Sequence, residues 1–112
     1  MSKITFGRIT GIQNDNGYWL HIPFETGRDW KGLMDARDEL EEAMEAVTIS
    51  CGPYLPKVPG KEAMIEWMTD DKAILHIPCH SRAEGATLQG LLRTKISALT
   101  GAPESKTPAL PW

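Results

Sequence analysis

The chain has no long hydrophobic run: no stretch of its 112 residues approaches the roughly 18 consecutive apolar residues that suffice to span a membrane. Its first residues also lack the apolar segment of a secretory signal. Cysteine is scarce, with Cys51 and Cys79 alone and no Cys-x-x-Cys motif. We therefore expect a cytoplasmic protein in which both cysteines are reduced thiols.

The chain also lacks a surplus of positive charge. Its 12 lysines and arginines stand against 15 aspartates and glutamates, for a formal net charge of −3. Binding that depends mainly on phosphate contacts requires a basic surface, so this balance argues against it. The sequence contains no phosphate-binding loop, dinucleotide fingerprint or metalloprotease signature.

What the chain does contain is an internal repeat. The tetrapeptide Leu-His-Ile-Pro occurs at 20–23 and again at 75–78, and residues 9–23 align with 64–78 without a gap. In both copies an apolar run, a polar turn and a second apolar run follow one another. Internal self-similarity dictates architecture. Here it predicts two ββα units related by a pseudo-two-fold axis.

The turns of the repeat predict hairpins. Asn16-Gly17 favours a type I′ turn, because both residue types tolerate a positive φ. A turn at this position pairs Ile12 with His21, and the same logic pairs Trp67 with His76 in the second copy. An alternative for residues 61–68 is a helical turn, since Glu and Met favour helix.

An amphipathic helix is expected after each hairpin, at about residues 27–46 and 83–100. Thr26 is the expected N-cap of the first helix, and Ser81 with Glu84 forms a capping box for the second. The β-branched segment that starts at Val47 predicts either a short strand or the exit from the first helix. The residues expected in the core are Leu20, Ile22, Leu33, Leu40, Leu75, Ile77, Leu88, Leu92 and Leu99.

These elements predict a single α+β domain over residues 1–101, in which two helices pack on one face of an antiparallel sheet. The two repeats cover about residues 3–47 and 61–101. A segment rich in proline and glycine, 48–60, connects them. Residues 102–112 have no periodicity and form an extended or disordered proline-rich tail.

Two kinds of chemistry match the composition. Cys51, His76, Cys79 and His80 are candidate zinc ligands, because thiolate and imidazole bind this metal. The repeat argues against this site, since the first copy keeps the histidine and not the Cys-His pair that follows it. A Cys79 nucleophile with His76 or His80 as its base is an alternative. We expect neither a metal nor a cofactor, and a protein that is not an enzyme.

The candidate binding site is the face of the sheet that the helices do not cover. Two tryptophans and several isoleucines form an apolar surface there, and large apolar patches mark interfaces. Trp112, at the end of the tail, is expected to dock on this face or on a partner. The competing interpretation is that the face is covered by the connector, with Tyr54, Leu55 and Val58, or by the tail, with Leu110 and Trp112. The candidate residues are Ile12, Trp19, His21, Ile65, Trp67, Ile74, His76 and Trp112.

We therefore expect a small non-enzymatic binding protein of the adaptor or inhibitor type. It would dock on a larger protein, or on itself as a homodimer, through this face or through the acidic outside of the first helix. In its short length, duplicated unit and acidic helix the chain resembles accessory and inhibitor proteins of phages and other mobile elements, although no specific motif carries this likeness. The alternatives are a Cys/His zinc-site protein and a single-stranded nucleic-acid-binding protein, whose sheet aromatics would stack on bases.

Overall fold

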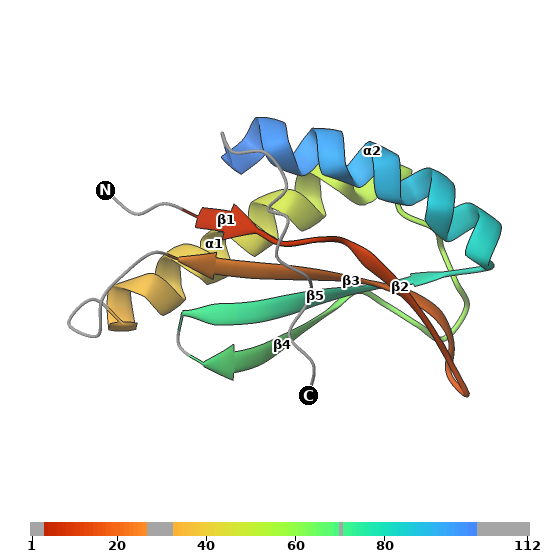
Figure 1. The fold of residues 1–112 in the computed structure, drawn as a ribbon, viewed down its shortest axis with the longest axis horizontal. Helices are drawn as coiled ribbons and strands as arrows, with labels where there is room; N and C mark the ends of the chain where they lie inside the picture. The colour runs from red at the N-terminus through yellow and green to blue at the C-terminus, as the bar shows by residue number, and fades with distance from the viewer. Residues whose placement is uncertain (1–3, 27–32, 70, 101–112) are drawn as a thin grey trace.

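The computed structural model of the chain describes residues 4–26, 33–69 and 71–100, with the backbone alone described at 33–36 and at 100. It is an α+β fold, as the sequence predicts: a five-stranded antiparallel sheet carries two helices on one face (Figure 1). Among the described residues, no helix is long and apolar enough to cross a membrane. In chain order the elements are β1 (Ile4–Phe6), β2 (Thr10–Asn14), β3 (Gly17–Thr26), α1 (Leu33–Cys51), the 3₁₀ helix η2 (Gly52–Tyr54), β4 (Met64–Thr69), β5 (Lys72–Cys79) and α2 (Arg82–Thr100).

The central strands of the sheet are β3 and β5, which pair antiparallel. Both β1 and β2 pair with the other side of β3, and β4 pairs with the other side of β5. The β3–β5 register places His21 opposite His76 and Ile22 opposite Leu75. Because side chains alternate along a strand, Ile22 and Leu75 point to the helices and the two histidines point away from them. The face that carries the histidines is called the outer face below.

The β2–β3 hairpin is tighter than the sequence predicts. Ile12 lies opposite Trp19 and not opposite His21, which shifts the register by two residues. Gly17 has a φ of 102°, whereas Asn16 does not have a positive φ, so the turn is not of type I′. Glycine takes the left-handed position at the end of the turn, where it meets no steric penalty. An even shift keeps side chains on their face, so Ile12, Trp19 and His21 share the outer face as predicted.

The second hairpin contains an irregularity that the first one lacks. Residues Met64–Thr69 form the strand β4, so the alternative of a helical turn over 61–68 is wrong. Next to the turn, Thr69 lies opposite Lys72, the pair equivalent to Asn14 and Gly17 of the first hairpin. Between Trp67 and Thr69 a β-bulge then shifts the register by one residue.

This bulge moves two candidate site residues to the other face of the sheet. Ile65 lies opposite Leu75 and Trp67 lies opposite Ala73, both of which point to the helices. A one-residue shift exchanges the two faces of a strand. The prediction that Ile65 and Trp67 belong to the outer face is therefore wrong, since both side chains pack against the core.

Helix α1 continues further than the sequence predicts. It ends at Cys51, so the segment that starts at Val47 is helical and is neither a strand nor part of the connector. Val47 and Cys51 extend the buried stripe of Leu40 and Met44, and this packing overrides the β propensity of the segment. The Thr48 hydroxyl donates a hydrogen bond to the Met44 carbonyl at 2.9 Å. The predicted start of this helix at 27–32, which Thr26 would cap, lies outside the described residues.

Helix α2 starts where its capping box predicts. Ser81 Oγ accepts a hydrogen bond from the Glu84 N–H at 3.2 Å. The reciprocal bond differs from the prediction, because the Glu84 carboxylate accepts from the backbone N–H of His80 at 2.6 Å. It also lies 2.9 Å from the His80 ring. These hydrogen bonds hold the pKa of Glu84 below its ordinary value.

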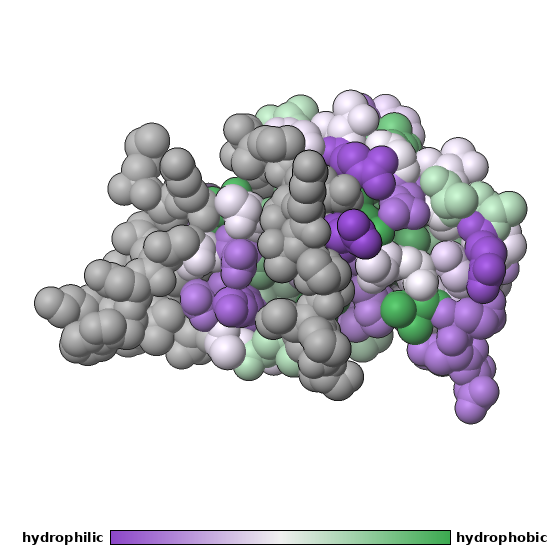
Figure 2. All heavy atoms as spheres, in the orientation of Figure 1, coloured by the Kyte–Doolittle hydropathy of each residue, from purple (hydrophilic) through white to green (hydrophobic). Residues whose placement is uncertain are grey.

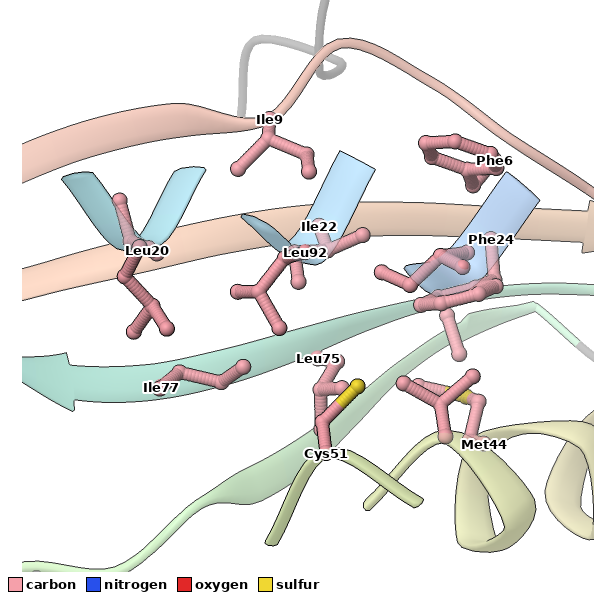
Figure 3. Close-up of a cluster of buried hydrophobic side chains, with 14 of the residues drawn as sticks. Phe6, Ile9, Leu20, Ile22, Phe24, Met44, Cys51, Leu75, Ile77 and Leu92 are labelled. Carbon is pink, nitrogen blue, oxygen red and sulfur yellow. The ribbon is translucent and has the colours of Figure 1, made fainter. Parts of the chain in front are cut away.

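The core lies between the sheet and the two helices (Figure 3). Leu99 is 45% exposed, so its prediction as a core residue is wrong: the buried stripe of α2 ends at Ile96. The side chain of Leu33 lies outside the described residues. The core also contains the neighbouring rings of Phe6 and Phe24. The predicted core residues that are buried are Leu20, Ile22, Leu40, Leu75, Ile77, Leu88 and Leu92.

Tyr18 determines how closely α2 approaches the first hairpin. Its ring lies against Gly11 of β2 and Gly85 of α2, and a Cβ atom at either glycine would overlap the ring. The Gln89 side-chain amide donates to the carbonyl of Ile9 and holds α2 to the same region. The helix therefore packs at a distance that only glycine permits at these two positions.

Candidate functional site

The centre of the outer face is a pair of histidines supported by a carboxylate. The rings of His21 and His76 meet edge to face with their centroids 4.3 Å apart. His76 Nε2 lies 2.9 Å from Oε1 of Glu66. Glu66 and Met64 are not among the residues predicted for this face: the bulge that removes Ile65 and Trp67 from it brings these two residues to it. No turn residue or periodicity in β4 marks the bulge.

The histidine pair has an electrostatic asymmetry. Burial lowers the pKa of His21 below its ordinary value of 6.5, the neighbouring His76 lowers it further, and Glu66 opposes both effects. His76 has the carboxylate partner, whereas His21 contacts the ring of His76 and forms no ion pair within the described part of the chain. The neutral form of His21 is therefore the form that suits the folded state.

We expect acid to destabilise the fold through His21. Its pKa is lower in the folded than in the unfolded chain, so the unfolded chain binds the proton more readily. Its stabilising contribution is complete above pH 6.5 and is lost as the pH falls through the lowered folded pKa. Unfolding free energies from urea titrations between neutral and acidic pH should therefore decline less steeply for His21→Gln than for the wild type. Parallel declines would show that other groups carry the acid sensitivity.

Trp19 is a structural residue and not an open anchor. Only 5% of it is exposed, and its indole N–H donates to the Asn16 carbonyl at 3.1 Å. Lys61, which directly follows the connector, donates to the same carbonyl. Val58 and Gly60 of the connector line a pocket beside the tryptophan, so the end of the connector borders this part of the outer face. The competing prediction that the connector folds over the whole face stays a prediction.

The other candidate residues are dispersed. Ile74 shares the outer face with the histidines but is only 1% exposed, whereas Ile12 is 37% exposed. Trp67 is half-buried on the helix side, where the Arg37 guanidinium lies 4.3 Å from the centre of its ring. Trp112 lies outside the described residues. The predicted aromatic surface is therefore not assembled as an open platform.

The candidate cysteine and histidine ligands do not converge. Cys51 and Cys79 are buried in the core on the helix side of the sheet, whereas His76 points to the outer face. His80 is exposed and contacts Glu84 and the carbonyl of Lys57. Within residues 4–26, 33–69 and 71–100, no group of three or more His, Cys, Asp or Glu side chains is arranged to hold a metal ion.

Neither thiol is activated for nucleophilic chemistry. Burial raises the pKa of Cys79 to about 11, with a further contribution from the Glu84 carboxylate. Burial also raises the pKa of Cys51, against a smaller effect of Lys95. A nucleophilic cysteine needs a thiolate at neutral pH and a base within reach. The structure supplies neither to Cys79, because His76 lies on the other side of the sheet and the ring nitrogens of His80 contact Glu84 and the carbonyl of Lys57.

We expect both cysteines to resist alkylation in the folded protein. Iodoacetamide attacks thiolate, and these thiols are buried and protonated at pH 8. Mass spectrometry after a short exposure at this pH should find little modification of native protein and complete modification in urea. Rapid native alkylation of Cys79 would contradict its buried position.

The strongest charge feature lies elsewhere, on the outside of α1. Asp38, Glu41, Glu42 and Glu45 are all exposed. They recur at i, i+3, i+4 and i+7 and therefore share one side of the helix. This side is opposite the buried stripe of Leu40. The four carboxylates are called the acidic face below.

Comparisons with known proteins give no relative from which function could be transferred. The chain matches no protein-family model, no curated protein and no solved structure. We therefore infer function from the geometry and charge of the chain itself.

Proposed function

We propose that the chain is a non-enzymatic binding protein, of the adaptor or inhibitor type, that docks its acidic face on a basic surface of a larger protein. Charge supports this proposal. Helix α1 carries six carboxylates and one arginine along its sequence, whereas the whole chain has a net charge of only −3. The negative charge of the molecule is therefore concentrated on one element.

The observation that carries the proposal is the repulsion within the acidic face. Asp38 with Glu42 and Glu41 with Glu45 are like-charge pairs at i, i+4, each of which destabilises a helix by about 0.2–0.5 kcal/mol. In the described part of the chain, none of these four carboxylates has an ion-pair partner. Folding alone does not require this arrangement. A partner with lysines or arginines opposite the stripe would relieve the repulsion and gain complementary charge.

The geometry favours the acidic face of α1 over the aromatic residues of the sheet as the docking surface. Trp19 is covered, and Trp67 lies on the helix side under Arg37. Single-stranded nucleic acid needs open aromatic rings and a basic track for its phosphates. The acidic face would repel such a ligand.

The test compares two variants that remove the same charge. Glu41→Gln/Glu42→Gln neutralises the centre of the acidic face, and Asp15→Asn/Glu25→Gln removes two exposed carboxylates elsewhere. Each is used as bait for affinity purification from the native cell, with quantitative mass spectrometry. We expect the α1 variant to lose the captured partner and the matched variant to keep it, with weaker capture by the wild type at high salt.

Stability gives this test a second readout. Removing like-charge neighbours should raise the unfolding free energy of the α1 variant slightly while its binding falls. Opposite changes in stability and binding separate a docking surface from a folding defect. Equal capture by both variants would overturn the proposal.

We also infer that residues 9–23 and 64–78 are two copies of one ββα unit. The register supports this, because the pseudo-two-fold axis would pass between His21 and His76, the equivalent residues of the two copies. Both turns also close on equivalent pairs, Asn14 with Gly17 and Thr69 with Lys72. An experimental structure checks it: residues 18–23 of β3 should superpose on residues 73–78 of β5 by rotation about this axis, and a register in which His21 does not lie opposite His76 would contradict the inference.

A further inference from the structure

A pocket opens on the outer face between the first hairpin turn and the connector. Its volume is about 610 Å³, within the range of small-molecule sites. Its walls come from segments far apart in the sequence, the β2–β3 turn on one side and the approach to β4 on the other. The lining residues that carry the argument are Asn16, Trp19, Val58, Lys61 and Met64.

Two hydrogen bonds hold the polar end of this pocket in place. The Trp19 indole and the Lys61 ammonium both donate to the carbonyl of Asn16. The N–H of Asn16 donates in turn to its neighbour Asn14 Oδ1 at 2.8 Å. The carbonyl is therefore occupied by the protein itself, and an incoming ligand does not need to satisfy it.

Lys61 is the cation of the pocket, whose lining also includes Glu62. An ammonium has three N–H donors, of which Asn16 takes one. Among the described residues, no carboxylate forms an ion pair with Lys61. The two remaining N–H donors of Lys61 are thus available to a ligand. Met64, which is 55% exposed, forms part of the apolar wall beside them.

We propose that this pocket binds a small molecule with an apolar body, aromatic or aliphatic, and a single anionic group. The apolar body lies against Met64 and Val58, and the carboxylate or sulfonate takes the open donors of Lys61. A charge-assisted hydrogen bond of this kind orients the ligand, and the apolar contact supplies the area. This site is separate from the acidic face of α1, and neither proposal depends on the other.

The test uses two dyes with the same ring system. Anilinonaphthalene sulfonate carries one anionic group, and N-phenylnaphthylamine lacks it. Both are titrated into the full chain, and their fluorescence is followed. Lys61→Gln removes the pocket cation, and Lys57→Gln removes an exposed lysine that does not line the pocket. Met64→Glu places a carboxylate in the pocket, and Ile49→Glu places one at an exposed site on α1.

We expect the sulfonate dye to saturate a single site on the wild type. Lys61→Gln should weaken its binding about fivefold and leave the neutral dye within about twofold, and Met64→Glu should abolish binding of the sulfonate dye. Lys57→Gln and Ile49→Glu should behave as the wild type. Circular dichroism confirms that each variant is folded. The proposal is overturned if the sulfonate dye does not saturate, if Lys61→Gln and Lys57→Gln have equal effects, or if Met64→Glu binds normally.

Discussion

Leu75→Ala should destabilise the protein by about 2–5 kcal/mol, the cost of a cavity in a packed core. Leu75 is 1% exposed on the central strand β5, opposite Ile22 and Ile65 on the two neighbouring strands. Its side chain lies where the sheet meets the helices (Figure 3). Few neighbours can move into the vacated space, because the core is held between the sheet and both helices. Urea denaturation followed by circular dichroism measures the loss.

Leu99→Ala is the matched control, since it removes the same atoms from an exposed position. Leu99 is 45% exposed at the end of α2. We expect its unfolding free energy to change by less than about 0.5 kcal/mol. If the two variants lost equal stability, the assignment of faces and of the end of the buried stripe would be wrong.

Trp19→Ala should cost about 3–5 kcal/mol, because a nearly fully buried aromatic side chain is removed. The substitution also removes the indole donor that, with Lys61, holds the carbonyl of Asn16. The sequence predicts that Trp19 lies on an uncovered apolar face, where its truncation would cost little stability. The structure reverses that expectation. Urea denaturation of Trp19→Ala distinguishes a buried Trp19 from an exposed one.

Two further variants separate the contributions at Trp19. Trp19→Phe keeps most of the apolar ring but removes the N–H donor, so its loss should be clearly smaller than that of Trp19→Ala. Met64→Ala removes an exposed neighbour and should have little effect on stability. A wild-type unfolding curve for Trp19→Ala would mean that the ring is not buried in solution.

The hairpins, the second helix and most of the core follow from local patterns. The Asn16-Gly17 dipeptide predicts the first turn, and the capping residues Ser81 and Glu84 predict the start of α2. Leu88 and Leu92 recur at helical spacing, and burial of such a stripe is nearly unavoidable once the helix forms. The end of α1 could not be predicted from a local pattern. The segment that starts at Val47 is β-branched, but it is helical because Val47 and Cys51 are buried in the core.

The candidate site depended on contacts that a local pattern does not contain. Both histidines were assigned to the outer face because they alternate with buried residues, but their contact at 4.3 Å requires β3 and β5 to be neighbours. The order of the strands is set by how the two hairpins pack on the helices. The acidic face, in contrast, is visible in the sequence, since helical spacing alone places its carboxylates on one side.

The sequence by itself determined the α+β class, two hairpins with a helix after each, and the acidic outside of α1. These features depend on turn residues, capping residues and the periodicity of apolar residues, all of which act over a few neighbouring positions. Only the tertiary structure decided the faces of Ile65 and Trp67, the burial of Trp19 and the pairing of His21 with His76. The physical reason is that one bulged residue reverses every side chain beyond it. Whether a strand bulges, and what covers it, depends on the packing of segments that are distant in the chain.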